Sequence, residues 1–307
     1  MPFLGIEIGG TKLQLVLGDK SGEISAPRRL AVKKEKGAEG IRRQIEVALP
    51  DLIRGKKIEA VGVGFGGPVN WKSGKICRSH QIEGWSEFDL AGWLQKLTGR
   101  RVRVDNDANV AALGEALRGA GKGFDPVSYV TLGSGVGGGL VTRGKIYHGA
   151  MPGEAEIGHV RLDRTGTTLE SRCSGWAVDA RARDAIKKEP KSVLAKIARK
   201  PPGGGTAKGE ARFLAEAVEV GDASAQKILE DVAEDLAFGF SHVVHLFHPE
   251  VIILGGGLSK VGEALRIRVE KRLTGFVMEA FRPGPPVKLA KLGEDAVPVG
   301  ALMLAGM

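Results

Sequence analysis

The sequence predicts an α/β protein of two similar halves with a cleft between them. Residues 3–8 form an apolar strand that leads into the turn Gly9-Gly10-Thr11 and a second strand around 13–17, where Leu alternates with other residues. Residues 127–132 and 140–142 repeat this pattern around the glycine run 133–139. Because strand, glycine turn and strand occur twice, each time ahead of helical segments, the chain is interpreted as a duplicated architecture.

The remaining elements follow the same α/β order. Apolar residues at helical spacing predict helices, and short apolar runs that end in glycine or polar residues predict strands. In the first half we expect a third strand, then a helix at 38–49, a strand at 60–64, a helix at 90–97, a strand at 102–104 and a helix at 108–117. In the second half we expect a helix at 225–247, a strand at 251–254 and a final helix at 297–304. The expected domains are a smaller one, 1–107 with about 291–307, and a larger one, 108–290.

The composition excludes several classes of protein. The chain has 46 glycines in 307 residues but no Gly-x-y period, so it is not collagen. Two cysteines cannot form a disulfide framework, which favours a reducing compartment. No apolar stretch reaches the roughly 20 residues that span a bilayer, and the first residues do not have the pattern of a signal peptide. We therefore expect a cytoplasmic protein without a membrane partner.

Most of the positive charge lies in one segment. The formal net charge is +9, and residues 181–208 contain nine Lys and Arg against Asp184 and Glu189. Proline and glycine, above all Pro201-Pro202-Gly203, predict a loop or a flexible insertion over 187–208. One interpretation of this segment is a solvated surface. The alternative is that its cations attract a polyanion such as inorganic polyphosphate.

Glycine turns follow three of the expected strands and indicate phosphate binding. They lie at Gly9-Gly10, within 133–139 and at 255–257. Backbone N–H groups can approach an anion closely where no Cβ stands in the way. None of the three fits the P-loop pattern, and the run at 133–139 lacks the helix that a dinucleotide-binding fingerprint requires next. A single turn of this kind can be a hairpin turn that binds no ligand. Three together predict a site for nucleotide phosphates.

Two groups of polar residues are candidates for chemistry. The run Asp105-Asn106-Asp107 stands between an expected strand and a helix. Asn and Asp commonly cap a helix here, but one cap is enough, so a carboxylate is available to take a proton from a substrate hydroxyl. The second group is Glu156, His159 and Glu170, whose donors and acceptors suit a polyhydroxylated ligand. A metal site is the alternative for that group.

In this order and spacing the motifs resemble the ROK family of bacterial sugar kinases, within the hexokinase, actin and Hsp70 ATPase superfamily. The resemblance covers essentially the whole chain and implies two actin-like (ribonuclease H-like) α/β domains. It is carried by the sequences at 6–12, 62–69, 106–112, 132–139, 156–159, 169–175 and 249–259.

The resemblance also implies a role for each motif. Asp107 would be the general base that removes a proton from a sugar hydroxyl. The sugar would be bound by Gly67, Asn106, Asp107, Glu156, His159 and Glu170. ATP would be bound by Gly9, Gly10, Thr11, Lys12, Ser134, Gly135, Gly255, Gly256 and Gly257. Glu7 would hold Mg²⁺ through water, and a homodimer is implied.

Three departures from the family pattern qualify these roles. The cysteine cluster that binds zinc in many members is missing, because 160–175 holds only Cys173. We therefore expect no structural zinc, which leaves His159 for the sugar. Glu7 stands where the family usually has Asp. The sequence Gln81-Ile82-Glu83-Gly84-Trp85 replaces Asn-x-Pro-Gly-Trp near the sugar, which leaves the hexose open among glucose, fructose, mannose and N-acetyl-hexosamines.

The expected function is transfer of a phosphoryl group from ATP to a hexose hydroxyl, with glucose as the foremost substrate. A polyphosphate-dependent glucokinase is the alternative that the basic segment suggests. A sugar-sensing ROK regulator is the alternative from another class. Such regulators carry a helix-turn-helix ahead of the first glycine turn, which begins here at Gly9, and the basic segment lacks interleaved aromatic residues. DNA is therefore not expected as a partner.

Overall fold

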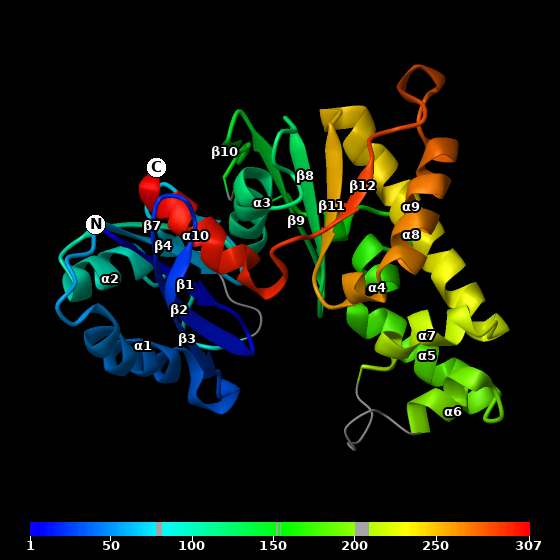
Figure 1. Ribbon diagram of the computed structural model, residues 1–307, viewed down its shortest axis with the longest axis horizontal. Coiled ribbons are helices and arrows are strands. Elements are labelled where there is room, and N and C mark those ends of the chain that lie inside the picture. Colours follow the sequence, from blue (N-terminus) through cyan, green and yellow to red (C-terminus); the bar gives the residue numbers. More distant parts are fainter. Residues whose placement is uncertain (78–81, 152, 154, 200–208) are drawn as a thin grey trace. The chain divides into compact units, whose positions relative to one another are not determined.

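The computed structural model describes residues 1–77, 82–151, 153, 155–199 and 209–307 (Figure 1). The chain forms two compact units. Unit 1 comprises Met1–Tyr129, Gly139–Ala155 and Lys291–Met307, and unit 2 comprises Val130–Gly138 and Glu156–Ala290. Both ends of the chain therefore lie in unit 1. The domain boundaries expected from the sequence stay a prediction.

The sheet of unit 1 has the strand order β3-β2-β1-β4-β7. Its strands are β1 (Phe3–Ile8), β2 (Lys12–Gly18), β3 (Ile24–Ala31), β4 (Ala60–Phe65) and β7 (Arg101–Asn106). The first three strands are antiparallel, whereas β1, β4 and β7 run parallel. Ile8 pairs with Phe65, and Phe65 pairs with Asn106. The residues that follow these three strands therefore meet at one edge of the sheet.

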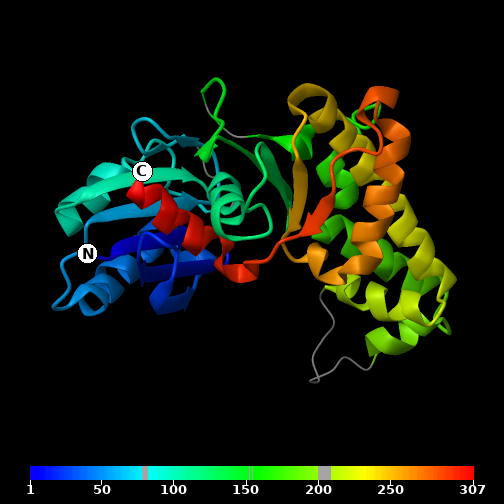
Figure 2. The same cartoon turned by 45° about the horizontal axis from the view of Figure 1, so that its top comes forward.

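In its described residues unit 1 also has four helices and the short hairpin β5 (Val69–Asn70) and β6 (Lys75–Ile76). The helices are α1 (Gly37–Ile53), α2 (Leu90–Thr98), α3 (Asp107–Arg118) and α10 (Ala296–Gly306). The last helix packs against α3, β4 and β1 (Figures 1 and 2). Buried Glu115 of α3 fixes the chain just before it, because its carboxylate accepts hydrogen bonds from the backbone N–H groups of Lys291 and Leu292 at 3.1 and 2.7 Å.

The second sheet repeats the connectivity of the first. Its order is β10-β9-β8-β11-β12, with β8 (Val127–Leu132), β9 (Val136–Thr142), β10 (Lys145–Ile146), β11 (Val251–Gly255) and β12 (Val287–Leu289). The structure corrects the expected turn at 133–139, because β9 already begins at Val136. A Cβ on Gly139 would stand 2.7 Å from Cβ of Ala112 and 3.0 Å from the carbonyl oxygen of Ala108. This glycine therefore serves close packing of β9 against α3.

Helices make up most of unit 2. They are α4 (Leu169–Cys173), α5 (Gly175–Lys188), α6 (Val193–Arg199), α7 (Leu214–Glu219), α8 (Ala223–Phe247) and α9 (Glu263–Phe276). The long helices α8 and α9 lie side by side (Figures 1 and 2). The expected loop over 187–208 is corrected in part, because 193–199 is helical with Leu194 and Ala195 buried. The rest of that loop, 200–208, lies outside the described residues.

Six short 3-10 turns connect these elements within the described ranges, at Lys34–Lys36, Ile157–His159, Glu210–Phe213, Leu258–Val261, Glu279–Phe281 and Gly293–Asp295. None of the helices in the described part of the chain combines the length and the apolar character that crossing a bilayer demands.

Candidate active site

The first part of the site lies at the edge of the unit 1 sheet where β1, β4 and β7 end. A Cβ built on Gly66 would stand 3.4 Å from Oδ2 of Asp107, 3.4 Å from the carbonyl oxygen of Ile8 and 3.6 Å from Cα of Gly9. The carboxylate of Asp107 and the first glycine turn are thus neighbours on either side of Gly66. A small cavity at this edge is lined by Ile8, Gly9, Gly10, Phe65, Gly66, Ile82 and Trp85. The structure therefore brings together three motifs that were predicted separately.

Asn106 and Asp107 divide two roles between them. The side-chain oxygen of Asn106 caps α3 by accepting hydrogen bonds from the backbone N–H groups of Ala108 and Asn109 at 2.8 and 3.2 Å. Its Nδ2 donates to the carbonyl oxygen of Gly67 at 3.2 Å. Oδ1 of Asp107 accepts a hydrogen bond from the backbone N–H of Ala108 at 2.9 Å. Asn106 is therefore the cap, and Asp107 presents its carboxylate in the first turn of α3.

Glu7 stands behind the first glycine turn and is the predicted magnesium residue. Its side chain is 12% exposed, Nζ of Lys12 lies 3.2 Å from Oε1, and Nε2 of Gln14 donates to Oε2 at 2.6 Å. Burial raises the pKa of the Glu7 carboxyl, against the lowering effect of Lys12. Buried Oε1 of Gln14 has no hydrogen-bond partner within the described structure. A carboxylate beside an unused amide oxygen fits the oxygen ligands of hydrated Mg²⁺.

The corresponding glycine turn of unit 2 spans Gly133 to Gly135. The backbone N–H of Gly133 donates to the carbonyl oxygen of Gly135 at 2.9 Å, and exposed Ser134 forms the tip. Oε2 of Glu170 accepts a hydrogen bond from the backbone N–H of Val136 at 2.8 Å, and a Cβ on Gly135 would collide with this carboxylate. The structure therefore places Glu170 directly on the second glycine turn.

The third predicted turn joins the second turn within unit 2. Gly255 is the buried last residue of β11, whereas Gly256 and Gly257 are exposed beyond it. Gly256 has φ +82°, and a Cβ there would stand 2.6 Å from the carbonyl of Leu132, the last residue of β8. The ends of β8 and β11 thus meet as the ends of β1 and β4 do in unit 1.

Glu156 and His159 lie at a 3-10 turn of unit 2. Their side chains are 52% and 73% exposed, and Nε2 of His159 is 4.0 Å from Oε2 of Glu156. Among the described residues, no group of three or more His, Cys, Asp or Glu side chains is placed to hold a metal ion. The metal interpretation of Glu156, His159 and Glu170 therefore gains no support, and their contact with a sugar stays a proposal.

A buried network beside Asp107 could not be predicted from the sequence. Oδ2 of Asp105 lies 2.6 Å from Nε2 of His148, and Oδ1 accepts hydrogen bonds from the backbone N–H of Asn106 and from Nδ2 of Asn109 at 2.8 and 3.0 Å. The ring of His148 stacks on Trp71 at 4.1 Å. Asp105 stood in the acidic run, but nothing local in the sequence linked it to a histidine 43 residues away.

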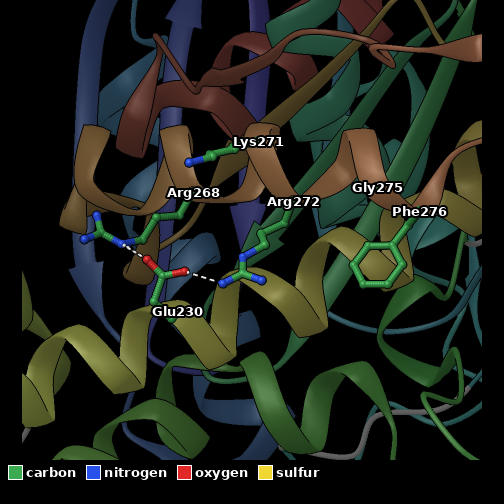
Figure 3. Close-up of a pocket in the computed structure, with 6 residues that line it drawn as sticks. All are labelled: Glu230, Arg268, Lys271, Arg272, Gly275 and Phe276. Carbon is green, nitrogen blue, oxygen red and sulfur yellow. Dashed lines mark hydrogen bonds and ion pairs between the residues drawn. The ribbon is translucent and has the colours of Figure 1, made fainter.

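A groove of about 560 Å³ lies on unit 2 between α8 and α9 (Figure 3). Its carboxylate, Glu230, accepts hydrogen bonds from Nε of Arg268 at 2.8 Å and from Nη2 of Arg272 at 3.0 Å, as Figure 3 shows. Arg272 also donates to Glu234. These guanidinium groups are occupied by ion pairs that join the two helices, so we interpret the groove as structural.

The fold defines a class of protein with two α/β sheets of the same connectivity, each with a glycine turn after its first strand. The chain belongs to the ROK family, whose model matches residues 3–307. It is 32% identical to a glucokinase of Thermotoga maritima over 98% of this chain and 96% of the relative.

Solved structures show the same fold along the whole chain. A ROK family glucokinase from Streptomyces griseus in complex with glucose and AMPPNP has a TM-score of 0.84 and 32% identity, over 100% of this chain and 99% of the other. A ROK hexokinase from Thermus thermophilus has a TM-score of 0.77 and 29% identity, over 100% and 98%. The expected actin-like α/β fold and the ROK resemblance are thereby confirmed.

Proposed function

We propose that the protein is a sugar kinase that transfers the γ-phosphoryl group of ATP to a hydroxyl of glucose, giving glucose 6-phosphate. The observation that carries this proposal is the position of Asp107, beside Gly66 and the first glycine turn at one edge of the unit 1 sheet. The names of the relatives support glucose as acceptor and ATP as donor.

Each predicted residue has a part in this proposal. Asp107 takes the proton from the attacking hydroxyl, so that the oxygen becomes nucleophilic as its bond to phosphorus forms and the bond to the leaving ADP breaks. The remaining sugar hydroxyls are bound by Gly67, Asn106, Glu156, His159 and Glu170. Backbone N–H groups in the glycine turns of both units bind the phosphates, through Gly9, Gly10, Thr11, Lys12, Ser134 and Gly135, with Gly255, Gly256 and Gly257 at the nucleoside.

Mg²⁺ would be held through water by Glu7, and Gln14 adds an unused amide oxygen beside it. When bound, the ion neutralises charge on the transferred phosphoryl group. Lys12, which pairs with Glu7 in the structure, is also available to bind an anionic phosphate. We propose that these two side chains separate when the nucleotide binds.

The contacts of the basic segment favour ATP over polyphosphate as donor. Nε and Nη2 of Arg183 donate to the two carboxylate oxygens of Glu210 at 2.9 Å each. Nη2 of Arg181 donates to Asp231 at 2.9 Å. The guanidinium groups at the start of the segment are therefore engaged within unit 2, which supports the interpretation of its charge as a folded, solvated surface.

Two assays with a panel of sugars test the proposal: ADP release measures turnover with ATP, and sugar phosphate formation compares ATP with polyphosphate as donor. Glucose should give the highest kcat/KM among glucose, fructose, mannose and N-acetyl-hexosamines, with ATP preferred to polyphosphate. Asp107→Asn should lower kcat by roughly 10²- to 10⁴-fold, because a positioned base is lost. Asp89→Asn is the matched control, since Asp89 caps α2 and Asn caps equally well. The proposal fails if no sugar stimulates ADP release or if Asp107→Asn stays fully active.

We also propose that the enzyme is a homodimer of the cytoplasm, where ATP is supplied. Light scattering after gel filtration should give twice the 32.4 kDa mass of one chain. A mass of one chain at micromolar concentration would rule out the dimer without touching the proposed reaction.

A further inference from the structure

The carboxylate of Asp105 is buried and fully engaged. The residue is 3% exposed, and its two oxygens accept the three hydrogen bonds already described, from His148, Asn106 and Asn109. Within the part of the chain that the structure describes, no Lys or Arg pairs with it. A buried carboxylate without hydrogen-bond partners is costly. His148 provides the partner of Oδ2 of Asp105.

Packing fixes the ring of His148 in place. The ring lies nearly parallel to that of Trp71, with an interplanar angle of 11°, and the side chain is 15% exposed. Gly153 closes over both rings, because a Cβ there would stand 2.8 Å from Cβ of His148 and 3.1 Å from Cδ1 of Trp71. The packing against Trp71 and Gly153 therefore holds the imidazole in the orientation in which it contacts Asp105.

The network reaches the first turn of α3 by two routes. Oδ1 of Asp105 binds the backbone N–H of Asn106, the residue that caps α3 and precedes Asp107. The same oxygen accepts a hydrogen bond from Nδ2 of Asn109. This Nδ2 also donates to the carbonyl oxygen of Gly153 at 3.1 Å. Both the residue before Asp107 and the residue two positions after it are thus tied to the segment that carries His148.

We infer that His148 is a positioning residue for phosphoryl transfer, which orients Asp107 through Asp105 and the capped first turn of α3. The inference rests on the proposed function, because it takes Asp107 as the base. It assigns to Asp105 the task of holding the backbone of that turn, with no contact to sugar or nucleotide. The displacement of a base by about 1 Å can cost up to about 10²-fold in rate.

Substitutions of His148 separate its hydrogen bond from its packing. His148→Phe keeps a ring on Trp71 but removes the donor, whereas His148→Gln places an N–H donor near the former Nε2. His148→Phe should lower kcat about 10- to 100-fold with KM for ATP unchanged, and His148→Gln should recover most of the loss. Thermal unfolding confirms that each variant is folded. If His148→Phe does not fold, His148→Asn, whose amide is too short to reach Asp105, takes its place.

A double-mutant cycle with Asp107→Asn decides whether His148 acts through the base. The loss caused by His148→Phe should disappear in the Asp107→Asn background. Equal losses in both backgrounds, or wild-type kcat in folded His148→Phe, would overturn the inference. These results differ from failure of the proposed function, in which Asp107→Asn alone keeps its activity. If Asp107→Asn is inactive and His148→Phe is fully active, only the role of His148 is lost.

Discussion

The two hairpin turns, Gly9–Thr11 in unit 1 and Gly133–Gly135 in unit 2, join equivalent strands but acquire their carboxylates differently. In unit 1 the carboxylate comes from Glu7 on the strand before the turn, and side chains of Lys12 and Gln14 bind it. In unit 2 it comes from Glu170 on α4, and a backbone N–H binds it. The two turns therefore differ: in unit 1 the carboxylate is bound by side chains of the same hairpin, whereas in unit 2 a carboxylate from a separate helix binds the backbone at the turn.

The largest effect should come from a methyl group added after β11 in unit 2, compared with a methyl group added after β4 in unit 1. Gly256→Ala forces an alanine into φ +82° and against the carbonyl of Leu132 at 2.6 Å. Strain of this kind costs about 1–3 kcal/mol before the overlap is counted, so calorimetry should show a clearly lower Tm. Gly66→Ala is the matched variant, because its nearest contacts are ordinary ones at 3.4 Å. Equal Tm values for the two variants would contradict the geometry of unit 2.

Substitution of Glu170 tests whether the second turn depends on its carboxylate. Glu170→Ala leaves the N–H of Val136 without its acceptor, which costs about 1–3 kcal/mol, and kcat/KM for glucose should fall roughly 10-fold or more. Glu170→Gln retains an oxygen that can accept this hydrogen bond, so its kcat/KM for glucose should fall less. Steady-state kinetics measure both variants. Identical losses would mean that the carboxylate acts on the substrate alone and has no part in shaping the turn.

Glu7→Gln should stabilise the protein while it weakens activity. Burial raises the pKa of Glu7 in the folded state. The contribution of Glu7 to the free energy of unfolding is therefore fully favourable at a pH below the ordinary carboxyl pKa. This contribution is lost as the pH rises through the raised pKa. Urea unfolding should therefore show the advantage of Glu7→Gln at pH 8 and little of it at pH 4. A variant less stable than the wild type at pH 8 would show that the pair with Lys12 outweighs burial.

The smallest effect concerns the two thiols, one in each unit. Cys173 of unit 2 is fully buried, and burial raises the pKa of its thiol, so little thiolate forms. Cys77 of unit 1 is partly exposed. Iodoacetamide at pH 8 should label Cys77 in the native enzyme and Cys173 only after denaturation, as peptide mass spectrometry can determine. Rapid native labelling of Cys173 would indicate that unit 2 opens readily.

Much of the fold could be predicted because its signals are local. The strand at 3–8 and the long helix at 225–247 were predicted to within a few residues from their apolar spacing. The start of β9 could not be, because Gly137–Gly139 carry no side chains that alternate. Helix α1 runs past Pro50 to Ile53 rather than ending near 49, since buried Leu49 and Leu52 hold it against the core while exposed Pro50 leaves a carbonyl to water.

The residue types and motifs of the sequence name the members of the candidate site, but they do not show how these residues support one another. Asp107 and the glycine turns stand out in the sequence because proton removal calls for a carboxylate, and close approach of backbone N–H groups to an anion calls for glycine. Which of Asn106 and Asp107 caps α3 depends on backbone angles that the sequence does not reveal. The pairing of Asp105 with His148 depends on how a distant segment folds back. Gln81, in the segment expected near the sugar, lies outside the described residues.

The packing of α10 has a consequence for synthesis of the protein. Gly62 of β4 and Gly300 of α10 are points where backbones touch, since a Cβ on either would overlap a carbonyl of Ala301 or Val110. Helix α3, which carries Asp107, therefore packs against a helix that is synthesised after all of unit 2. Until then the nascent unit 1 exposes an apolar face, while unit 2 already has nearly all of its own residues. A stop codon ahead of α10 should therefore yield chains that proteases remove, rather than a weakly active enzyme.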